Sequence, residues 1–180
     1  MNLNTQPNII PDLDVDNWPT VECNGVLWAV SPVMWAPIAI GDAKQVAEEY
    51  GCEVPTEELV MAIHSASHVK LSPLLRNHDG TPATMSSNVV YEDQKSKILS
   101  QLNALGLDFA SQKVIITGTH KDIIQDANGK CGIFGWSLRA DGTWIQPAFF
   151  GHGGFWCDYS QGLRLCKKIV YGTVEIYSNT

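Results

Sequence analysis

The sequence is poor in charge, and poorest in positive charge. Only 17% of its 180 residues are charged, and 12 Lys and Arg against 19 Asp and Glu give a formal net charge of −7 at pH 7. A charged fraction below the ~25% of an average globular chain argues against a disordered protein. Phosphate contacts need clustered Lys and Arg, and the one basic doublet is Lys167–Lys168, so we expect no nucleic-acid polymer as a partner.

Long apolar runs and a cysteine framework are also missing. No stretch reaches the ~18 apolar residues of a membrane span, and "MNLNTQPNIIPDLDVD" lacks the basic-then-apolar pattern of a secretion signal. The 5 cysteines form no C-x-x-C pair and leave one unmatched, which indicates free, mostly buried thiols. We therefore expect no membrane partner and a protein that folds in the cytoplasm of the producing cell.

Helix signals gather between residues 40 and 106. Asp42 followed by Gln45 matches a capping box, and Gly51 stands where that helix would end. Thr56 is suited to cap a second helix, because acidic residues follow it in the first turn. Apolar residues at three- and four-residue steps predict a third helix that Gly106 ends.

After residue 113 the pattern becomes that of strands, rich in β-branched and aromatic residues. The segments are "KVIITG", "DIIQD", "CGIFGWSLR", "TWIQPAF" and "GLRLCKKIVYGTVEIY", with a hairpin turn at "RADG" where Asp141–Gly142 would adopt positive φ. We therefore predict one α+β domain over residues 1–180, with N-terminal helices packed on a C-terminal antiparallel sheet. Its parts are an extended arm (1–24), a mainly helical region (40–106) and a mainly β region (113–178).

The densest run of chemistry is "GHGGFWCDYSQGLRL", residues 151–165. Asp158, Ser160 and Arg164 alternate, so in a strand they would share one face. Aromatic residues surround them, and we expect this face to line the main pocket with His152 leaning over it. Cys157 would lie on the opposite face, as a core thiol rather than a nucleophile.

A second polar run, "GTHKDII", places His120, Lys121 and Asp122 side by side. It is either a solvated turn between strands or, with a bulge, part of the same cleft. His64 and His68 are four residues apart on the predicted second helix, a spacing that suits zinc, but a surface pair is the simpler interpretation. We expect no cofactor and no metal; a zinc site built from His120, Asp122, His152 and Asp158 is the weaker alternative.

The C-terminal half resembles an uncharacterised family of bacterial and phage proteins. The shared motifs stand here as "GTHKDII", "FGWSLRADGTWIQPAFFGH" and "DYSQGLRL", and the helical stretch "AKQVAEEYGCEVPTEELVMAI" is also similar. The family has histidine where this chain has Ser137 and Gln161. If either histidine carries the proton in the family, this chain is inactive or relies on His152. The resemblance places these residues at motif positions: Lys121, Asp122, Gln146, His152, Asp158, Ser160 and Arg164.

The leading interpretation is a small phage-encoded hydrolase that acts on peptidoglycan, released by lysis or carried in a virion. His152 would be the general base, oriented by Asp158 or Asp122, and Ser160 would be the nucleophile or would position a water. Lys121 and Arg164 would hold a substrate carboxylate or a developing oxyanion. The other residues expected to bind the substrate are Asp122, Gln146 and Trp156.

Two interpretations from other classes remain open. The first is a protein that binds or cleaves a nucleotide signal in an anti-defence role, with aromatic rings on the base and cations on the phosphates. Its ligand would be small and anionic. The second is a non-catalytic virion or assembly protein, whose N-terminal arm packs on another copy of the chain or on a larger particle.

Overall fold

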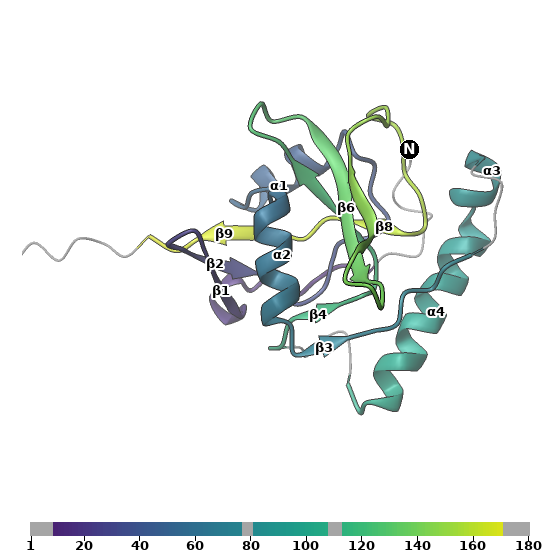
Figure 1. Cartoon of the computed structure of the whole chain (residues 1–180), viewed down its shortest axis with the longest axis horizontal. Helices are drawn as coiled ribbons and strands as arrows, with labels where there is room; N and C mark the ends of the chain where they lie inside the picture. The colour runs from purple at the N-terminus through teal and green to yellow at the C-terminus, as the bar shows by residue number, and fades with distance from the viewer. Residues whose placement is uncertain (1–8, 77–80, 108–112, 171–180) are drawn as a thin grey trace, which may run out of the picture.

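The computed structural model describes residues 9–76, 81–107 and 113–170. The α-helices in these ranges are α1 (Ala43–Glu49), α2 (Glu57–Ala66), α3 (Pro82–Met85) and α4 (Asn88–Ala104), and Val15–Asn17 forms a 3₁₀ turn, η2 (Figure 1). The strands are β1 (Thr20–Cys23), β2 (Val26–Val30), β3 (Val69–Lys70), β4 (Ile116–Thr117), β5 (Lys121–Gln125), β6 (Cys131–Leu138), β7 (Trp144–Phe149), β8 (Gln161–Gly162) and β9 (Cys166–Lys168).

The described strands form three sheets. The largest has the order β7-β6-β5-β8, in which β6 is antiparallel to β7 and β5, and β8 is parallel to β5. Strands β1-β2-β9 form an antiparallel sheet, and β3 and β4 form a short parallel pair. Helices beside mainly antiparallel sheets confirm the predicted α+β class.

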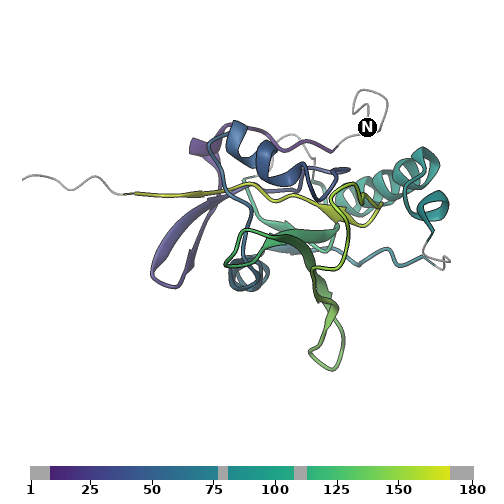
Figure 2. The ribbon, with the colours of Figure 1, turned by 90° about the horizontal axis from the view of Figure 1, so that it is seen from above.

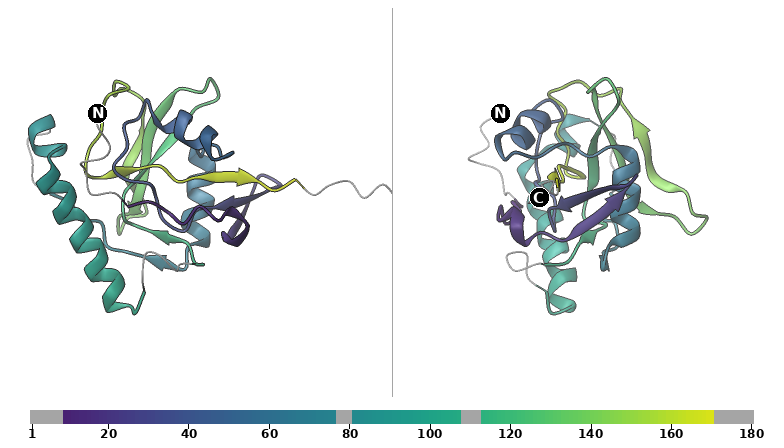
Figure 3. Two further views of the ribbon diagram at one scale, coloured as in Figure 1. Left: turned by 180° about the vertical axis from the view of Figure 1, so that it is seen from behind. Right: turned by 90° about the vertical axis from the view of Figure 1, so that its left-hand side faces the viewer.

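Helix α2 packs against the largest sheet and against the three-stranded one. Val60 contacts a cluster with Ile124 of β5 and Phe134 of β6, while Ile63 packs in a cluster with Val21 of β1. The long helix α4 and the β1–β2 hairpin lie at opposite ends of the molecule in Figure 1 and in the reverse view of Figure 3. No described helix is both long enough and apolar enough to cross a membrane.

The predicted helix boundaries are largely confirmed, but one predicted cap does not form. Thr56 accepts a hydrogen bond from the backbone N–H of Leu59, which satisfies one of the open donors of the first turn of α2. Asp42 precedes α1 without such a bond, so the predicted capping box is wrong. Gly51 and Gly106 both have positive φ, 63° and 70°, directly after their helices.

Part of the predicted N-terminal arm is a strand of a sheet. Residues 20–23 form β1, which pairs with β2 through a two-residue turn at Asn24 and Gly25, whose φ values are 52° and 74°. Asn-Gly is the strongest short sequence signal for such a hairpin, and polar composition alone conceals it. Residues 1–8 of the predicted arm lie outside the described residues.

The hairpin predicted at "RADG" is confirmed. The N–H of Gly142 donates to the carbonyl of Arg139 at 3.0 Å, and β6 and β7 are antiparallel on either side. Of the two residues expected to adopt positive φ, Gly142 does so, at 81°. Figure 2 shows this green hairpin projecting away from the body of the molecule.

The strand predicted through the D-Y-S motif is wrong. Residues 151–160 form loops and turns, and pairing begins only at β8. The cause is local, because the Asp158 carboxylate accepts the N–H of Ser160 two residues later and so closes a turn instead of a strand. Residues 171–178 of the predicted β region lie outside the described residues.

A buried cluster fixes this loop to the helices. Cys157 and Tyr159 pack with Tyr91 of α4 and Trp136 of β6. The N–H of Tyr159 also donates to the carbonyl of Met85, at the end of α3, at 2.9 Å. The segment 156–160 is therefore held on both sides, and the polar groups that it carries have fixed positions.

Candidate functional site

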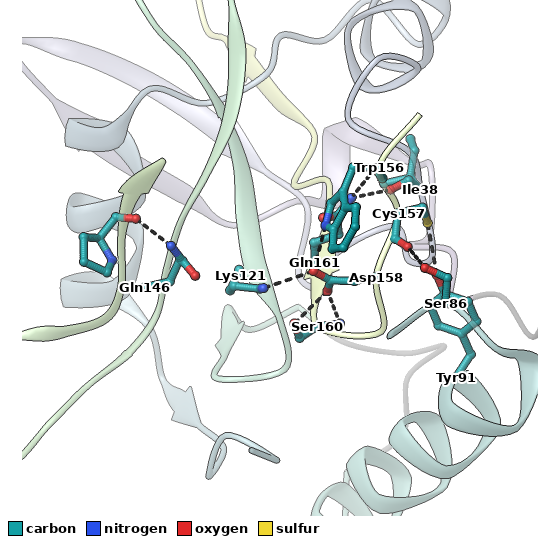
Figure 4. Close-up of polar contacts among 11 residues, drawn as sticks. Ile38, Ser86, Tyr91, Lys121, Gln146, Trp156, Cys157, Asp158, Ser160 and Gln161 are labelled. Atoms are coloured by element: carbon teal, nitrogen blue, oxygen red, sulfur yellow. Dashed lines mark hydrogen bonds and ion pairs between the residues drawn. The ribbon is translucent and has the colours of Figure 1, made fainter. Parts of the chain in front are cut away.

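The centre of the polar cluster is the carboxylate of Asp158, which is 1% exposed. Its Oδ1 atom accepts the N–H and the O–H of Ser160, both at 2.7 Å. Its Oδ2 atom is 3.2 Å from the Nζ atom of Lys121 and accepts the indole N–H of Trp156 at 3.2 Å (Figure 4). Each of the two carboxylate oxygens thus accepts two hydrogen bonds.

These contacts determine the charge of Asp158. Burial raises the pKa of its carboxyl group, but the ammonium of Lys121 and the hydrogen bonds from Ser160 and Trp156 outweigh burial. The pKa of Asp158 is therefore held below its ordinary value, and the group is ionised at neutral pH.

Strand pairing brings Lys121 to this carboxylate. Lys121 is the first residue of β5 and lies opposite Gln161 of β8 in parallel register. Its backbone N–H donates to the carbonyl of Ser160 at 2.6 Å. Figure 4 shows the Lys121 side chain extending from β5 toward Asp158, across a sequence distance of 37 residues.

His152 lies near this buried cluster and reaches solvent. Its half-buried ring lies parallel to the indole of Trp156, with centroids 4.6 Å apart, and meets the edge of Phe149 at 4.8 Å. Partial burial lowers the pKa of His152, Asp158 opposes that change, and Lys121 adds to it. The imidazole is therefore mainly neutral at pH 7 and able to accept a proton.

His152 lines a cavity of about 310 Å³. The other lining residues come from the start of α1, the β5–β6 turn and the loop after β7: Ile40, Gly41, Lys44, Gly129, Lys130, Cys131 and Gly154. The N–H of Gly41 donates to the carbonyl of Gly154 at 2.8 Å, which joins two of these segments. Lys44 and Lys130 were not predicted as site residues: Lys130 lies outside the motifs, and Lys44 lies in the similar helical stretch 43–63, which was not expected to contribute to the site.

Arg164 does not face a pocket, which corrects the placement predicted for it. It is fully buried, and its guanidinium donates to the carbonyls of Ser31 at 2.5 Å, Pro32 at 3.0 Å and Ile116 at 2.8 Å. The guanidinium presents five donors, and these carbonyls together with the Asp122 carboxylate, at 3.6 Å, occupy its surroundings. Arg164 thus joins separate parts of the backbone and has no room for a substrate.

Ser160 and Asp158 are also turned inward. Both are 1% exposed, and neither lines the cavity beside His152. The Ser160 hydroxyl already donates to Asp158, so it is not placed to attack a substrate. The prediction that both would face the main pocket is wrong, because a turn rather than a strand sets their directions.

Gln146 lies apart from this cluster. It is on β7, half-buried, and its side-chain N–H donates to the carbonyl of Pro147 at 2.9 Å. Figure 4 shows it across the sheet from Asp158. Asp122 is likewise separated, since it pairs with Arg164, and burial raises its pKa to about 7 while Arg164 opposes that change.

Two further buried residues lie near Asp158; the sequence named His120 only as part of a possible cleft or of the alternative zinc site, and gave Gln161 no role. His120 is 3% exposed, and burial lowers its pKa to about 4, with Asp158 opposing that change and Arg164 and Lys121 adding to it. Gln161 donates to the carbonyls of Ile38 at 2.9 Å and Trp156 at 3.1 Å. Gln161 stands at a histidine position of the resembled family, so here an amide supports the backbone of Trp156.

The remaining candidates from the sequence, Cys157, His64 and His68, do not lie at the cavity beside His152. Cys157 is buried, as predicted, and lies 3.2 Å from the hydroxyl of Tyr91, and burial raises the pKa of its thiol to about 11. His64 is buried against Trp144, but α2 ends at Ala66, so His68 does not share its helical face. Within the described ranges, no group of three or more His, Cys, Asp and Glu side chains could hold a metal.

Comparisons of this chain with protein-family models, with curated protein sequences and with solved structures found no match.

Proposed function

We propose that this chain is a small hydrolase in which His152 activates a water molecule, and that its substrate is peptidoglycan. The observation that carries the proposal is the position of His152: a neutral, half-buried imidazole lining a cavity, with an ionised carboxylate behind it. A general base needs a pKa near or below the working pH and access to the reacting proton.

The residues behind His152 serve as positioning residues. Trp156 supports the imidazole face, and Asp158 holds the indole N–H of Trp156 in place. Lys121 balances the charge of Asp158 within the interior. Since Ser160 is buried and already bonded, water is the nucleophile that this geometry favours over a serine.

Peptidoglycan fits the cavity chemically. Its stem peptides contain amide bonds and free carboxylates, and the cavity beside His152 also carries Lys44 and Lys130. A phage-encoded enzyme, released by lysis or carried in a virion, would reach this substrate from a cytoplasmic site of synthesis. The net charge of −7 opposes approach to an anionic cell wall, so the positive cavity would have to provide the local attraction.

The test is release of muropeptides from purified sacculi by the wild type and by His152→Ala. We expect release by the wild type and a loss of about a hundredfold or more in the variant, the usual range for a general base. His68→Ala is the matched control, because His68 is an exposed histidine outside the cavity. Equal background release from wild type and His152→Ala contradicts the proposal.

One observation favours a second candidate, the binding of a nucleotide signal. The side chain of Phe155 is 97% exposed and follows Gly154, which lines the cavity with Lys44 and Lys130. An exposed ring one residue along the chain from a cavity lined by two cations suits a base and its phosphates. Thermal melting with cyclic dinucleotides and ADP-ribose tests this, since a bound ligand raises the melting temperature; an unchanged melting temperature with all of them contradicts it.

A further inference from the structure

We infer that the cavity beside His152 contains an oxyanion subsite, in which Lys44 and Lys130 bind a carboxylate of the substrate. The inference rests on the proposed function for the identity of the carboxylate, and on the lining of the cavity for the anion. It assigns to these two lysines the recognition that sequence analysis gave to Lys121 and Arg164.

The charged side chains that line this cavity all have the same sign. Lys44 comes from α1 and Lys130 from the turn before β6, and the other titratable lining groups are His152 and Cys131. No Asp or Glu side chain lines the cavity, and across the described part of the chain neither lysine forms an ion pair. Two ammonium groups at one cavity without a carboxylate leave their charge available to a ligand.

This arrangement contrasts with the rest of the molecule. The chain has a net charge of −7, so a random surface depression would more often be acidic. Burial is the largest influence on the pKa of the Cys131 thiol and raises it; Lys44 lowers this pKa, and the carboxylate of Asp126 raises it. The field of Lys44 thus reaches the cavity wall, although Asp126, which does not line the cavity, opposes it. A depression lined by one sign of charge concentrates the field within it and attracts the opposite sign.

The backbone keeps the space beside the lysines open. Gly129 has φ of +75°, and the Nζ atom of Lys44 lies 3.6 Å from where a Cβ at this residue would be. On the opposite wall a Cβ at Gly41 would lie 2.9 Å from the carbonyl oxygen of Gly154. The contact at Gly129 is an ordinary van der Waals distance, but a side chain at Gly41 would push the two walls apart. The absence of a side chain at Gly41 therefore preserves the cavity.

A carboxylate beside His152 also gives the subsite a role in the reaction. The anion would fix one end of the substrate at the lysines, so that an amide bond near this end meets the water held by His152. Lysines act as point charges and do not impose the bidentate geometry of arginine. A subsite of this kind therefore selects the charge and position of the carboxylate rather than its orientation.

The experiment is calorimetric titration of the full chain at low ionic strength with N-acetyl-D-alanyl-D-alanine, and separately with inorganic phosphate. The test variant is Lys44→Gln with Lys130→Gln. The control is Lys70→Gln with Lys97→Gln, which removes the same charge from exposed lysines outside the cavity. We expect the test variant to weaken the Kd for the dipeptide by at least about tenfold, the loss of a charge-assisted hydrogen bond, and the control to leave it unchanged.

An NMR titration of His152 provides a readout specific to the cavity. A bound anion stabilises the imidazolium, so the dipeptide should raise the measured pKa of His152 in the wild type and not in the test variant. Thermal unfolding of both double variants establishes that they are folded.

The outcomes separate this inference from the proposed function. Lysine-dependent dipeptide binding without release from sacculi supports the subsite and contradicts the hydrolase. Binding of phosphate but not of the dipeptide supports an oxyanion site and contradicts a substrate carboxylate. Equal affinity in the test and control variants, or no binding of either probe, overturns the subsite even where sacculi are cleaved.

Discussion

The indole of Trp156 joins His152 to Asp158. Its N–H donates to the Oδ2 atom of Asp158 at 3.2 Å, and its ring lies parallel to the imidazole of His152 at a tilt of 2°. Asp158 is therefore connected to His152 through the indole of Trp156, which is bonded to one and stacked on the other. This relationship places Trp156 between the interior network and the solvent.

Trp156→Phe should separate these two effects, because phenylalanine keeps a ring against His152 and lacks the N–H. We expect a loss of about 1.5–3 kcal/mol in unfolding free energy, the usual value for a hydrogen bond to a charged group. We also expect kcat to fall about tenfold through misplacement of the imidazole, with KM unchanged. Urea denaturation and sacculus turnover measure the two quantities.

Trp28→Phe is the control for this substitution, since Trp28 is a half-buried tryptophan on β2 outside the cavity. A rise in KM would show that Trp156 contacts the substrate itself. A shift of the acid limb of the pH–rate profile would show that the indole N–H affects the pKa of His152. An unchanged kcat would show that the indole N–H has no positioning role.

Asp158→Asn should be among the most destabilising single substitutions in the chain. It leaves the ammonium of Lys121, whose side chain is 9% exposed, without its carboxylate. Breaking one partner of a buried pair typically costs about 3–5 kcal/mol. Glu53→Gln is the matched control, because Glu53 pairs with Lys168 at 3.6 Å on the surface, where such pairs contribute about 0–1 kcal/mol.

Guanidinium denaturation of both variants provides the comparison. Lys121→Met in the Asp158→Asn background should recover part of the loss, because it removes the unpaired charge. A cost for Asp158→Asn as small as that for Glu53→Gln would mean that Lys121 finds water and that the pair is not a buried one.

The sequence predicted the fold class because the signals for it are local. Helix ends at Thr56, Gly51 and Gly106 depend on capping chemistry within a few residues, and the hairpin at Gly142 depends on one turn. The β1–β2 hairpin had an equally local signal in Asn24–Gly25, and the polar surroundings obscured it. What each of these residues does is decided by its immediate neighbours in the chain.

The candidate site was predictable only in part, because its geometry depends on side-chain directions and on contacts between distant segments. The run 151–165 does contain His152, Trp156 and Asp158, and residue type alone selected it as the candidate site. The direction of each side chain depended on the strand parity, and one carboxylate bonding its own backbone at Ser160 removed that parity. Lys44 lies at the cavity because residues 40–44 contact residues 152–154. A contact between segments so far apart in the chain leaves no local sequence pattern.

Two buried groups should give the unfolding free energy opposite pH dependences. Burial raises the pKa of Asp122 to about 7, so this residue favours the folded state at low pH, and that contribution is lost as the pH rises from 3.8 to about 7. Burial lowers the pKa of His120 to about 4, so its contribution is full above pH 6.5 and is lost as the pH falls toward about 4. In the wild type the two slopes partly cancel between pH 4 and 6.5.

Single variants should reveal each slope. Asp122→Asn leaves the His120 slope, so stability should rise with pH by up to about 1.4 kcal/mol per unit between pH 4 and 6.5. His120→Gln leaves the Asp122 slope, so stability should fall with pH across the same interval. Urea denaturation at a series of pH values measures both, and slopes of the same sign in the two variants would contradict the assignment of opposite shifts.

Gly41→Ala should disrupt the close contact between Gly41 and Gly154, which joins two walls of the cavity beside His152. The added Cβ would lie 2.9 Å from the oxygen and 3.1 Å from the Cα atom of Gly154, and both are backbone atoms that cannot rotate away. The loop must therefore move, and the 2.8 Å hydrogen bond from the Gly41 N–H to Gly154 is lost or lengthened. Overpacking of this kind costs about 1–3 kcal/mol.

Gly153→Ala is the control on the same loop, because a Cβ there meets no atom within 4 Å. Thermal unfolding should place the Gly41 variant below the Gly153 variant, and dipeptide titration should show weaker binding for the Gly41 variant alone. Equal stability and equal affinity in the two variants would show that the Gly41–Gly154 contact does not shape the cavity.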